Sequence, residues 1–313
     1  MALIFVFSFG IIIFWIEPQT FPTVFEGVWW AIITTSTVGY GDYAPVTILG
    51  RIVGITLILL GAGFVSTYFI TLATATVTKQ NNFIEGKVMY KGKNHFIIIG
   101  WNERSREIIN RVQNEDKYRS IILIDETLEK NPLLNHSVHF IRGRSNRDDV
   151  LIKANILSAD KVLITADQNK DELQADMFTI LTLLAIKGLN SKVHCIAEIL
   201  TTEQISNAKR AGADEVIQSN ILTSFVMVNS LTDEGIAESI FPLLDHLNGN
   251  KLSFSEADPF VGKSFLDANS VLLHQGTLLL GIKRGENTIV NPPNDYTIET
   301  NDQLLLIEKY LIE

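Results

Sequence analysis

Two uninterrupted apolar stretches open the chain and predict membrane-spanning helices. Residues 2–16 contain no charged side chain, and residues 46–78 contain only Arg51. A helix needs about 20 apolar residues to cross the core of a bilayer. The second stretch therefore predicts a full span, whereas the first predicts a span that either continues before Met1 or lies tilted and thinly anchored.

A short helix is predicted between the two stretches. Thr23 and Glu26 have the spacing of a capping box, with Thr23 as the N-cap. The helix would cover 24–35, and the negative pole of its dipole would face a central cavity and favour a cation there. We expect Trp29 and Trp30 to pack around the following loop rather than to lie at the membrane interface.

From His95 onward, short apolar runs alternate with helical periods. Continuous apolar strands separated by helices predict a parallel, doubly wound sheet of the Rossmann type. The strands are expected at 95–99, 120–125, 138–141, 161–166, 192–198 and 214–218, and the helices at 103–114, 146–156, 170–188 and 201–211.

Charge divides the chain in the same way. The formal net charge of -9 belongs almost entirely to the part after the second apolar stretch, and such an acidic domain does not suggest nucleic-acid binding. Lys79, Lys87, Lys91 and Lys93 follow that stretch, whereas the loop between the stretches has no Lys or Arg before Arg51. The positive-inside rule therefore places the C-terminal part in the cytoplasm.

The loop after the short helix carries the most specific motif. It reads TVGYGD and consists of Thr37, Val38, Gly39, Tyr40, Gly41 and Asp42. The motif resembles the selectivity filter of potassium channels, in which four copies aim carbonyl oxygens at K⁺ in place of its hydration shell. Gly39 and Gly41 suit this role because carbonyls that all point one way need dihedral angles that a Cβ disfavours.

Gly61 and Gly63 lie inside the predicted second span, where each costs up to about 1 kcal/mol relative to alanine. A gating hinge explains them, and so does close helix packing. Further along, threonines at helical spacing would either line a wet vestibule or bond back to their own helix. They are Thr67, Thr71, Thr74 and Thr78.

The turn after the first Rossmann strand carries part of a dinucleotide-binding pattern. The full pattern would place glycines at 100, 102 and 105, and this chain has Gly100, Asn102 and Ser105. Asn102 can adopt a positive φ, but its side chain crowds the approach of a pyrophosphate. Ser105 is small enough for helix–sheet packing.

Two charged residues extend this candidate site. Asp125 ends the second strand, where an acid would bond a ribose hydroxyl. Arg144, expected to face Asp125, would form either a simple ion pair or a phosphate clamp. A nucleotide site and a purely structural turn both remain open as interpretations.

Together, the pore motif and the Rossmann pattern resemble prokaryotic potassium channels with a "regulator of conductance of K⁺" (RCK) domain. These include an archaeal calcium-gated channel and two-span Bacillus channels. The resemblance lies in GWNERS, HFIRG, KAN, AGAD and PPNDY, at 100–105, 139–143, 153–155, 211–214 and 292–296. It implies a homotetrameric pore above a ring of RCK domains, in which a bound ligand pulls on the second span.

The same resemblance implies the domain boundaries. The expected parts are a pore domain (1–78), a linker (79–93), a Rossmann domain (94–220), crossover helices (221–250) and a small α+β C-terminal subdomain (251–313) with strands near 277–282 and 303–307.

The resemblance allows two classes of ligand, a divalent cation and a nucleotide. The calcium-gated relative uses carboxylates at the ends of the fourth and fifth strands. Here Glu198 matches one position, but Thr165 and Leu200 occupy the others. Ca²⁺ takes six to eight oxygens, several of them anionic, so this site is expected to be lost unless Asp167 helps to rebuild it. We expect an adenine nucleotide or NAD(H) ahead of Ca²⁺.

Other classes of protein fit part of the pattern. A Rossmann domain alone allows a NAD-dependent, membrane-anchored oxidoreductase, but no constellation suited to hydride chemistry stands out. A regulatory subunit of a potassium transporter would lack the attached filter. We expect a channel rather than an enzyme, in the plasma membrane of a prokaryote. The resemblance also implies that initiation at Met89 would supply extra soluble RCK subunits.

Overall fold

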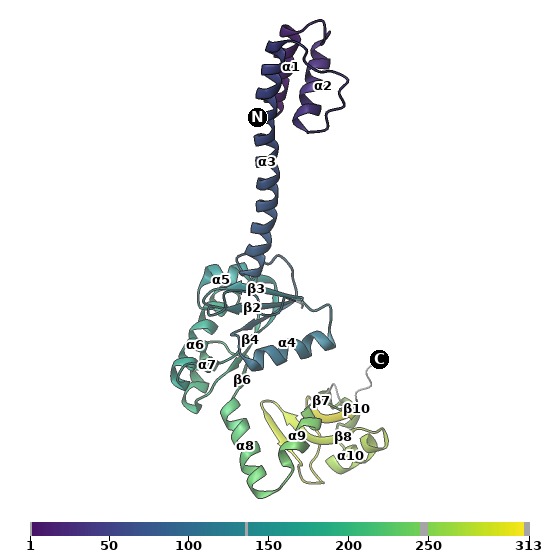
Figure 1. The fold of residues 1–313 in the computed structure, drawn as a ribbon. Helices are drawn as coiled ribbons and strands as arrows, with labels where there is room; N and C mark the ends of the chain where they lie inside the picture. The colour runs from purple at the N-terminus through teal and green to yellow at the C-terminus, as the bar shows by residue number, and fades with distance from the viewer. Residues whose placement is uncertain (1, 135–136, 245–249, 310–313) are drawn as a thin grey trace. The chain divides into compact units, whose positions relative to one another are not determined.

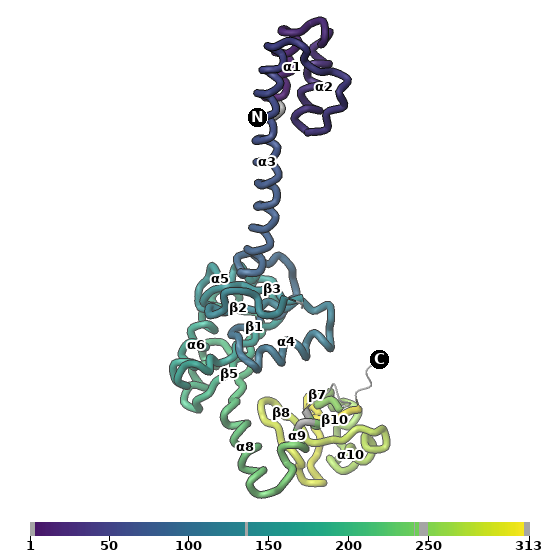
Figure 2. Tube along the Cα trace, in the orientation of Figure 1, coloured from purple at the N-terminus to yellow at the C-terminus, as the bar shows by residue number. Residues whose placement is uncertain are grey.

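The chain forms two compact units, Met1–Val88 and Met89–Glu313. The computed structural model describes residues 2–134, 137–244 and 250–309. Figures 1 and 2 trace the chain from the purple N-terminal helices through the teal parallel sheet to the yellow C-terminal sheet. The division between the units lies inside the segment predicted as a linker.

Three helices build the first unit: α1 (Ala2–Ile16), α2 (Val24–Thr35) and α3 (Ile48–Ile84). α1 and α2 can pack closely because Gly27 has no Cβ, which would collide with the carbonyl of Gly10. Small residues allow this close approach between membrane helices. The helices enclose an apolar core that contains Ile13, Phe21, Trp30, Ala31 and Leu57.

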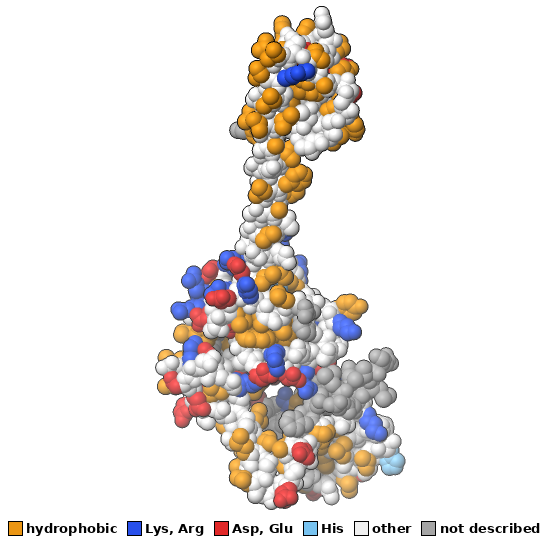
Figure 3. Space-filling model, in the orientation of Figure 1, with side chains coloured by type: hydrophobic (Ala, Val, Ile, Leu, Met, Phe, Trp, Pro, Cys, Tyr) orange, Lys and Arg blue, Asp and Glu red, His pale blue; other side chains and the backbone are white. Residues whose placement is uncertain are grey.

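The outer surface of this unit is largely apolar. Orange hydrophobic side chains spread over it in Figure 3, whereas blue and red side chains gather on the second unit. Ile4 is 72% exposed and Ile48 is 80% exposed. Because soluble proteins rarely expose such large apolar patches, this surface fits contact with lipid.

Helix length separates α3 from α1. Within the described residues, α3 is the one helix that is long and apolar enough to cross a membrane. It continues to Ile84, six residues beyond the predicted end of the span. α1 has 15 residues and measures about 22 Å, which is less than the roughly 30 Å of a bilayer core. The first predicted span is therefore short in the structure.

The start of α2 differs from the predicted capping box. Thr23 is the N-cap, but its side chain makes no hydrogen bond to the helix backbone. Instead, the hydroxyl of Thr23 donates to the carboxylate of Glu26. The two side chains satisfy each other, so the helix begins without the backbone bonds of a capping box.

Six parallel strands form the sheet of the second unit, in the order β3-β2-β1-β4-β5-β6. This is the strand order of dinucleotide-binding Rossmann folds. The strands are β1 (His95–Ile99), β2 (Ile121–Asp125), β3 (Val138–Arg142), β4 (Ala159–Ile164), β5 (His194–Glu198) and β6 (Glu215–Ile217). The predicted doubly wound sheet is confirmed, and each strand begins and ends within two residues of its expected range.

Helices cover both faces of this sheet. On one face lies α4 (Glu103–Glu115), whose Ile109 packs against Ile98 of β1. On the other face lie α5 (Asp148–Lys153), α6 (Glu172–Leu189) and α7 (Ile205–Arg210). Short 3₁₀ turns, η1 (Ile156–Ser158) and η2 (Thr202–Gln204), complete two of the predicted helical segments. Burial on both faces explains why the strands are continuously apolar.

The C-terminal part contains more strands than predicted. After α8 (Ser219–Thr232) and α9 (Ile236–Leu244), an antiparallel sheet has the order β7-β10-β8-β9. In the chain, η4 (Asp258–Phe260) and α10 (Phe265–His274) lie between β7 and β8. The strands are β7 (Asn250–Glu256), β8 (Leu278–Arg284), β9 (Asn287–Val290) and β10 (Gln303–Lys309). β8 and β10 were predicted, whereas β7 and β9 were not. Part of the predicted crossover segment, 245–249, lies outside the described residues.

Candidate functional sites in the pore loop and the Rossmann cleft

The TVGYGD loop leaves the end of α2 with an alternating backbone. Thr37, Gly39 and Gly41 have positive φ angles of 64°, 57° and 76°. The backbone N–H groups of Val38 and Gly39 both donate to the carbonyl of Ile33, at 3.0 and 3.1 Å. The two glycines therefore occupy positions where a Cβ is disfavoured, as the predicted filter geometry requires.

Trp29 supports the outer end of this loop. Its indole Nε1–H donates to Oδ2 of Asp42 at 2.8 Å. The ring also stacks on Tyr40, with centroids 6.1 Å apart and an interplanar angle of 8°. Trp30 is buried instead and packs against Phe21 at 5.4 Å. The prediction that both tryptophans pack around the loop is therefore confirmed for Trp29, whereas Trp30 packs in the apolar core of the unit.

Glu17, directly after α1, is a residue of the pore unit that the sequence analysis missed. It is 4% exposed, and its carboxylate accepts from the backbone N–H groups of Val46 at 3.0 Å and Thr47 at 2.8 Å, and from the Thr47 hydroxyl. Glu17 thus fixes the segment that returns from the filter to the N-cap of α3. The available signal was a lone acid directly after the first apolar stretch.

The two glycines of α3 have different surroundings. A Cβ on Gly61 would lie 2.8 Å from Cγ2 of Thr35, whereas a Cβ on Gly63 would meet nothing within 4 Å. Close packing therefore accounts for Gly61, and Gly63 is free of it. The hydroxyls of Thr67 and Thr71 donate to carbonyls one turn back, at 2.8 and 2.7 Å, as the backbone-bonding interpretation expects.

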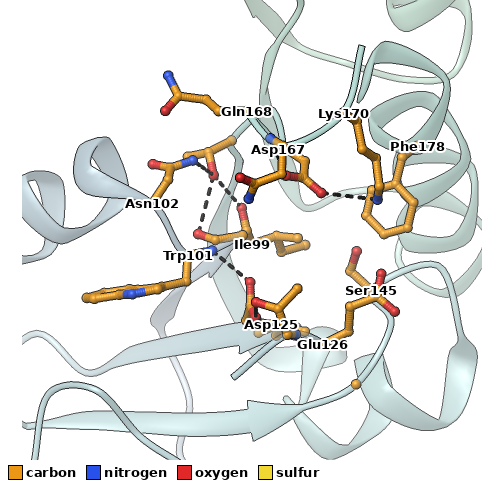
Figure 4. Close-up of a pocket in the computed structure, with 16 residues that line it drawn as sticks. Ile99, Trp101, Asn102, Asp125, Glu126, Ser145, Asp167, Gln168, Lys170 and Phe178 are labelled. Carbon is orange, nitrogen blue, oxygen red and sulfur yellow. Dashed lines mark hydrogen bonds and ion pairs between the residues drawn. The ribbon is translucent and has the colours of Figure 1, made fainter. Parts of the chain in front are cut away.

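A cleft opens at the carboxyl ends of β1, β2 and β4, where the strand order reverses. It encloses about 60 Å³ and is otherwise open to solvent. Ligands of open α/β sheets bind at this point of the fold. Of the predicted site residues, the cleft brings together Gly100, Asn102, Asp125 and Asp167; Ser105, Arg144 and Glu198 are not in its lining (Figure 4).

The turn at Gly100 needs a glycine for packing against Thr165, as well as for the approach of a ligand. Gly100 has a φ of 92°, and a Cβ there would lie 2.7 Å from Oγ1 of Thr165. Asn102 has an extended backbone rather than the positive φ considered above, because it is the N-cap of α4. Its Oδ1 accepts from the N–H of Ser105 at 2.9 Å, and its Nδ2 donates to Thr165 Oγ1 at 3.2 Å. Ser105 completes this capping box and is fully buried.

Asp125 holds the two turns of the cleft together. Its Oδ2 accepts from the N–H of Trp101 at 2.8 Å (Figure 4). Its Oδ1 accepts from the N–H groups of Thr127 and Leu128, at 2.7 and 3.0 Å, and from the Thr127 hydroxyl at 2.6 Å. Both oxygens of the carboxylate thus accept hydrogen bonds from protein groups. A ribose hydroxyl that donates to Asp125 would have to share an oxygen with those groups.

Arg144 does not pair with Asp125. Its Nε donates to Oε2 of Glu126 at 2.7 Å, and its side chain is 68% exposed. The predicted contact was wrong because Arg144 follows the Gly143 turn and points toward a neighbouring hollow, whose lining includes Arg142 and Arg147.

The residues aligned with a calcium site already have protein partners, except that Oε1 of Glu198 is buried without a hydrogen-bond partner among the described residues. Oε2 of Glu198 lies 3.0 Å from Nη2 of Arg104 and accepts from the N–H of Ala166 at 2.8 Å. The hydroxyl of Thr165 donates to a backbone carbonyl at 2.9 Å. Asp167 pairs with Lys170 at 3.1 Å. These groups do not fit Ca²⁺, which takes six to eight oxygen ligands. Among the described residues, no group of three or more His, Cys, Asp or Glu side chains is placed to hold a metal ion.

Among the described residues that line the cleft, Lys170 is the one cation. Its ammonium lies 4.6 Å from the centroid of the Phe178 ring as well as beside Asp167 (Figure 4). Sequence reasoning did not find Lys170, because its place opposite Asp125 depends on the loop after β4.

The comparisons with known proteins agree with the division of the chain into two units. Residues 1–78 match the ion channel family, and residues 96–219 match the TrkA-N domain. The chain is 42% identical over 306 residues to the Bacillus subtilis potassium channel protein YugO, covering 96% of this chain and 91% of that protein. It is 30% identical over 290 residues to the calcium-gated potassium channel TvoK of Thermoplasma volcanium, covering 91% and 82%.

Two solved structures share the fold. The human SLO3 gating ring has a TM-score of 0.55 and 20% identity, over 68% of this chain and 44% of that one. The GsuK channel bound to NAD has a TM-score of 0.53 and 14% identity, over 98% of this chain and 56% of that one. This chain thus spans about half the length of these structures. By its identity to YugO and TvoK, the chain belongs to the family of potassium channels that join a pore domain to a TrkA-N (RCK) domain.

Proposed function

We propose that the opening of this potassium channel is controlled by an adenine nucleotide or NAD(H) bound in the Rossmann cleft. The observation that carries the proposal is the cleft itself, which lies where the strand order reverses and is walled by Gly100 and Asp125. GsuK, a channel of the same fold, has been solved with NAD and with ADP. The alternative ligand, the calcium of TvoK, is less well supported because Arg104 neutralises Glu198.

The chain between the pore and the sheet provides the connection for gating. Immediately after the first unit, the N–H of Tyr90 donates to the carbonyl of Lys153 at 2.8 Å, and Nδ2 of Asn155 donates to the carbonyl of Gly92 at 2.7 Å. These bonds tie the incoming segment to the end of α5. A ligand shifts the equilibrium between the closed and open states only by its difference in affinity for them. A difference of about 1.4 kcal/mol per subunit changes the equilibrium constant tenfold.

The channel would assemble as a homotetramer in the plasma membrane of a prokaryote, with the second unit in the cytoplasm. A filter needs four copies of its loop, and Tyr40 is 70% exposed in the single subunit. The second unit also leaves apolar side chains uncovered on α6 and α8. They include Met177, Leu181, Phe225, Met227 and Leu231, and such surfaces mark protein interfaces.

Met89 offers a second product from the same chain. It is the first residue of the second compact unit, so initiation there would release that unit as a soluble RCK subunit. An immunoblot for a C-terminal tag in the native host should show a smaller band that disappears in Met89→Leu. A single full-length band would exclude this route.

An oxidoreductase is the competing function for a Rossmann cleft. Among the described residues, those that line the cleft include no His, Cys or Tyr, and their one Lys is paired with Asp167. His, Lys and Tyr are frequent proton donors and acceptors in such chemistry, and the carboxylates of the lining, Asp125 and Asp167, already bond protein groups. We therefore infer a regulatory rather than a catalytic site.

Calorimetry on the full-length channel in nanodiscs tests the proposed ligand. ATP, ADP, AMP and NAD(H) should be titrated into the wild type, Lys170→Gln and Gly100→Ala, whose new Cβ would crowd Thr165. We expect binding of at least one nucleotide, weakened in both variants, with no effect of Glu198→Gln. Absence of nucleotide binding, together with Ca²⁺ binding that Glu198→Gln removes, would contradict the proposal.

A further inference from the structure

A basic hollow lies beside the cleft, at the carboxyl end of β3. Four cationic side chains line it, Arg142, Arg144, Arg147 and Lys153, against two carboxylates, Glu126 and Asp149, an excess of two positive charges. Charged side chains gather over α5 in Figure 3. The whole chain carries a formal charge of -9. A positive hollow in an acidic protein attracts anions locally, because clefts focus the field of the charges that line them.

The cations of this hollow are available to a ligand. Arg144 pairs with Glu126 at 2.7 Å and Arg147 pairs with Asp149 at 2.9 Å, but the arginine side chains are 68% and 65% exposed. Exposed ion pairs contribute little to stability, so a stronger anion can replace either carboxylate. Within the described part of the chain, Arg142 and Lys153 form no ion pair.

The turn that carries the arginines is fixed before any ligand binds. Gly143 has a φ of 154°, and a Cβ there would lie 2.5 Å from Cγ2 of Val150. Ser145 is 2% exposed, and its hydroxyl lies 3.0 Å from that of Thr182 on α6. A fixed turn lowers the entropy lost when its side chains close on a phosphate.

The hollow and the cleft are neighbours. Glu126 and Gly143 line both of them. Strand register also places Arg142 directly opposite Asp125, and the N–H of Gly143 donates to the Asp125 carbonyl at 3.0 Å. One ligand can therefore lie in the cleft and extend an arm over Gly143 into the hollow.

We propose that the basic hollow is a phosphate subsite for the ligand of the cleft. The site would select an adenine nucleotide that carries a phosphomonoester beyond its ribose, and would favour it over a nucleoside or a dinucleotide without that group. Guanidinium groups bind phosphate through paired, charge-assisted hydrogen bonds. This inference rests on the proposed nucleotide function of the cleft.

Calorimetry on the full-length channel in nanodiscs of neutral lipid tests the subsite with matched ligand pairs. NADP⁺ against NAD⁺, and ADP against adenosine, differ mainly in phosphate. We expect the phosphorylated member of at least one pair to bind more tightly, and Arg142→Gln with Lys153→Gln to weaken its binding by about tenfold or more. Lys117→Gln serves as the control. Lys117 is exposed and precedes β2, so it lies at the amino ends of the strands, whereas the hollow lies at their carboxyl ends.

The outcomes separate the subsite from the cleft. If both members of each pair bind equally and the double variant changes neither, the subsite is wrong and the nucleotide function of the cleft stands. If pyrophosphate binds and the double variant abolishes this, while no nucleotide or nucleoside binds, the cleft proposal fails. If the double variant loses only binding to vesicles of anionic lipid, the hollow is a lipid site and the phosphate subsite is overturned.

Discussion

At the scale of single residues, Gly61 and Gly63 distinguish packing from hinge bending in α3. Gly61→Ala should force its Cβ against Cγ2 of Thr35, 2.8 Å away, at the base of the filter. Overpacking of this kind costs about 1–3 kcal/mol. Gly63→Ala has no such neighbour and should gain up to about 1 kcal/mol of helix propensity.

Thermal unfolding and single-channel recording of both variants check this prediction. Gly61→Ala should lower the unfolding temperature and the conducting fraction, and Thr35→Ser should partly restore both by removing Cγ2. If both alanine variants are as stable as the wild type and both fail to open, the two glycines act as a hinge instead.

His95 gives the second unit a stability that depends on pH. The side chain is fully buried, Nε2–H donates to the Ala154 carbonyl at 2.9 Å, and the rings of Tyr90 and His139 lie nearby. Burial lowers the pKa of His95 below its usual value, and repulsion from His139 adds to this, although the bond to Ala154 opposes it. The unfolded chain therefore binds more protons than the folded one below about pH 6.5.

The consequence is a loss of stability on acidification. As the pH falls through about 6.5 toward the folded pKa, the free energy of unfolding should decrease by up to about 1.4 kcal/mol per pH unit. Denaturant unfolding of the channel at pH 7.5, 6.5 and 5.5 measures the slope, and His95→Gln should reduce it. An unchanged slope in His95→Gln would assign the effect to other groups.

At the scale of elements, Asn102 shows why a broken glycine pattern still builds a Rossmann turn. Its side chain caps α4 and reaches Thr165 across the cleft. Asn102→Gly would remove that side chain and open the approach to the N-terminus of α4, where a pyrophosphate binds. Glycine is nearly as good an N-cap as asparagine, so the stability of the helix should fall by only a few tenths of a kcal/mol.

We expect Asn102→Gly to bind NAD(H) several-fold more tightly than the wild type. Asn102→Ala is the matched variant, since it removes the cap but retains a Cβ, and calorimetry compares the three. Weaker binding to Asn102→Gly than to the wild type would mean that the amide contacts the ligand rather than blocking it.

The elements also show what the sequence could and could not predict. The strands of the Rossmann sheet were predictable because burial on both faces makes them apolar throughout, as in the fully buried β2. β7 and β9 were not, because both are largely exposed and mix polar with apolar residues. The partner of Glu198 was equally out of reach, since Arg104 on α4 is distant in sequence and meets Glu198 only in the folded domain. The pair of Asp167 and Lys170 is local, three residues apart, and was overlooked.

At the scale of the whole molecule, we propose that the two units divide permeation from regulation. In this account the TVGYGD loop supplies the carbonyl groups that replace the hydration of K⁺, and a substitution in the cleft leaves this loop unchanged. Variants of the second unit should therefore alter how often the channel opens without altering which ion it passes. The filter variant Gly39→Ala should do the reverse and abolish K⁺ current while the protein still binds nucleotide.

The most direct test of this account is a recording of single channels in planar bilayers, with a K⁺ gradient opposed by Na⁺ and with nucleotide added to the side of the second unit. The account predicts a reversal potential that follows K⁺ and an open probability that changes with nucleotide in the wild type but much less in Lys170→Gln. A channel that passes Na⁺ and K⁺ equally, or one whose open probability ignores ATP, ADP, AMP, NAD(H) and NADP⁺ but follows Ca²⁺, would contradict it.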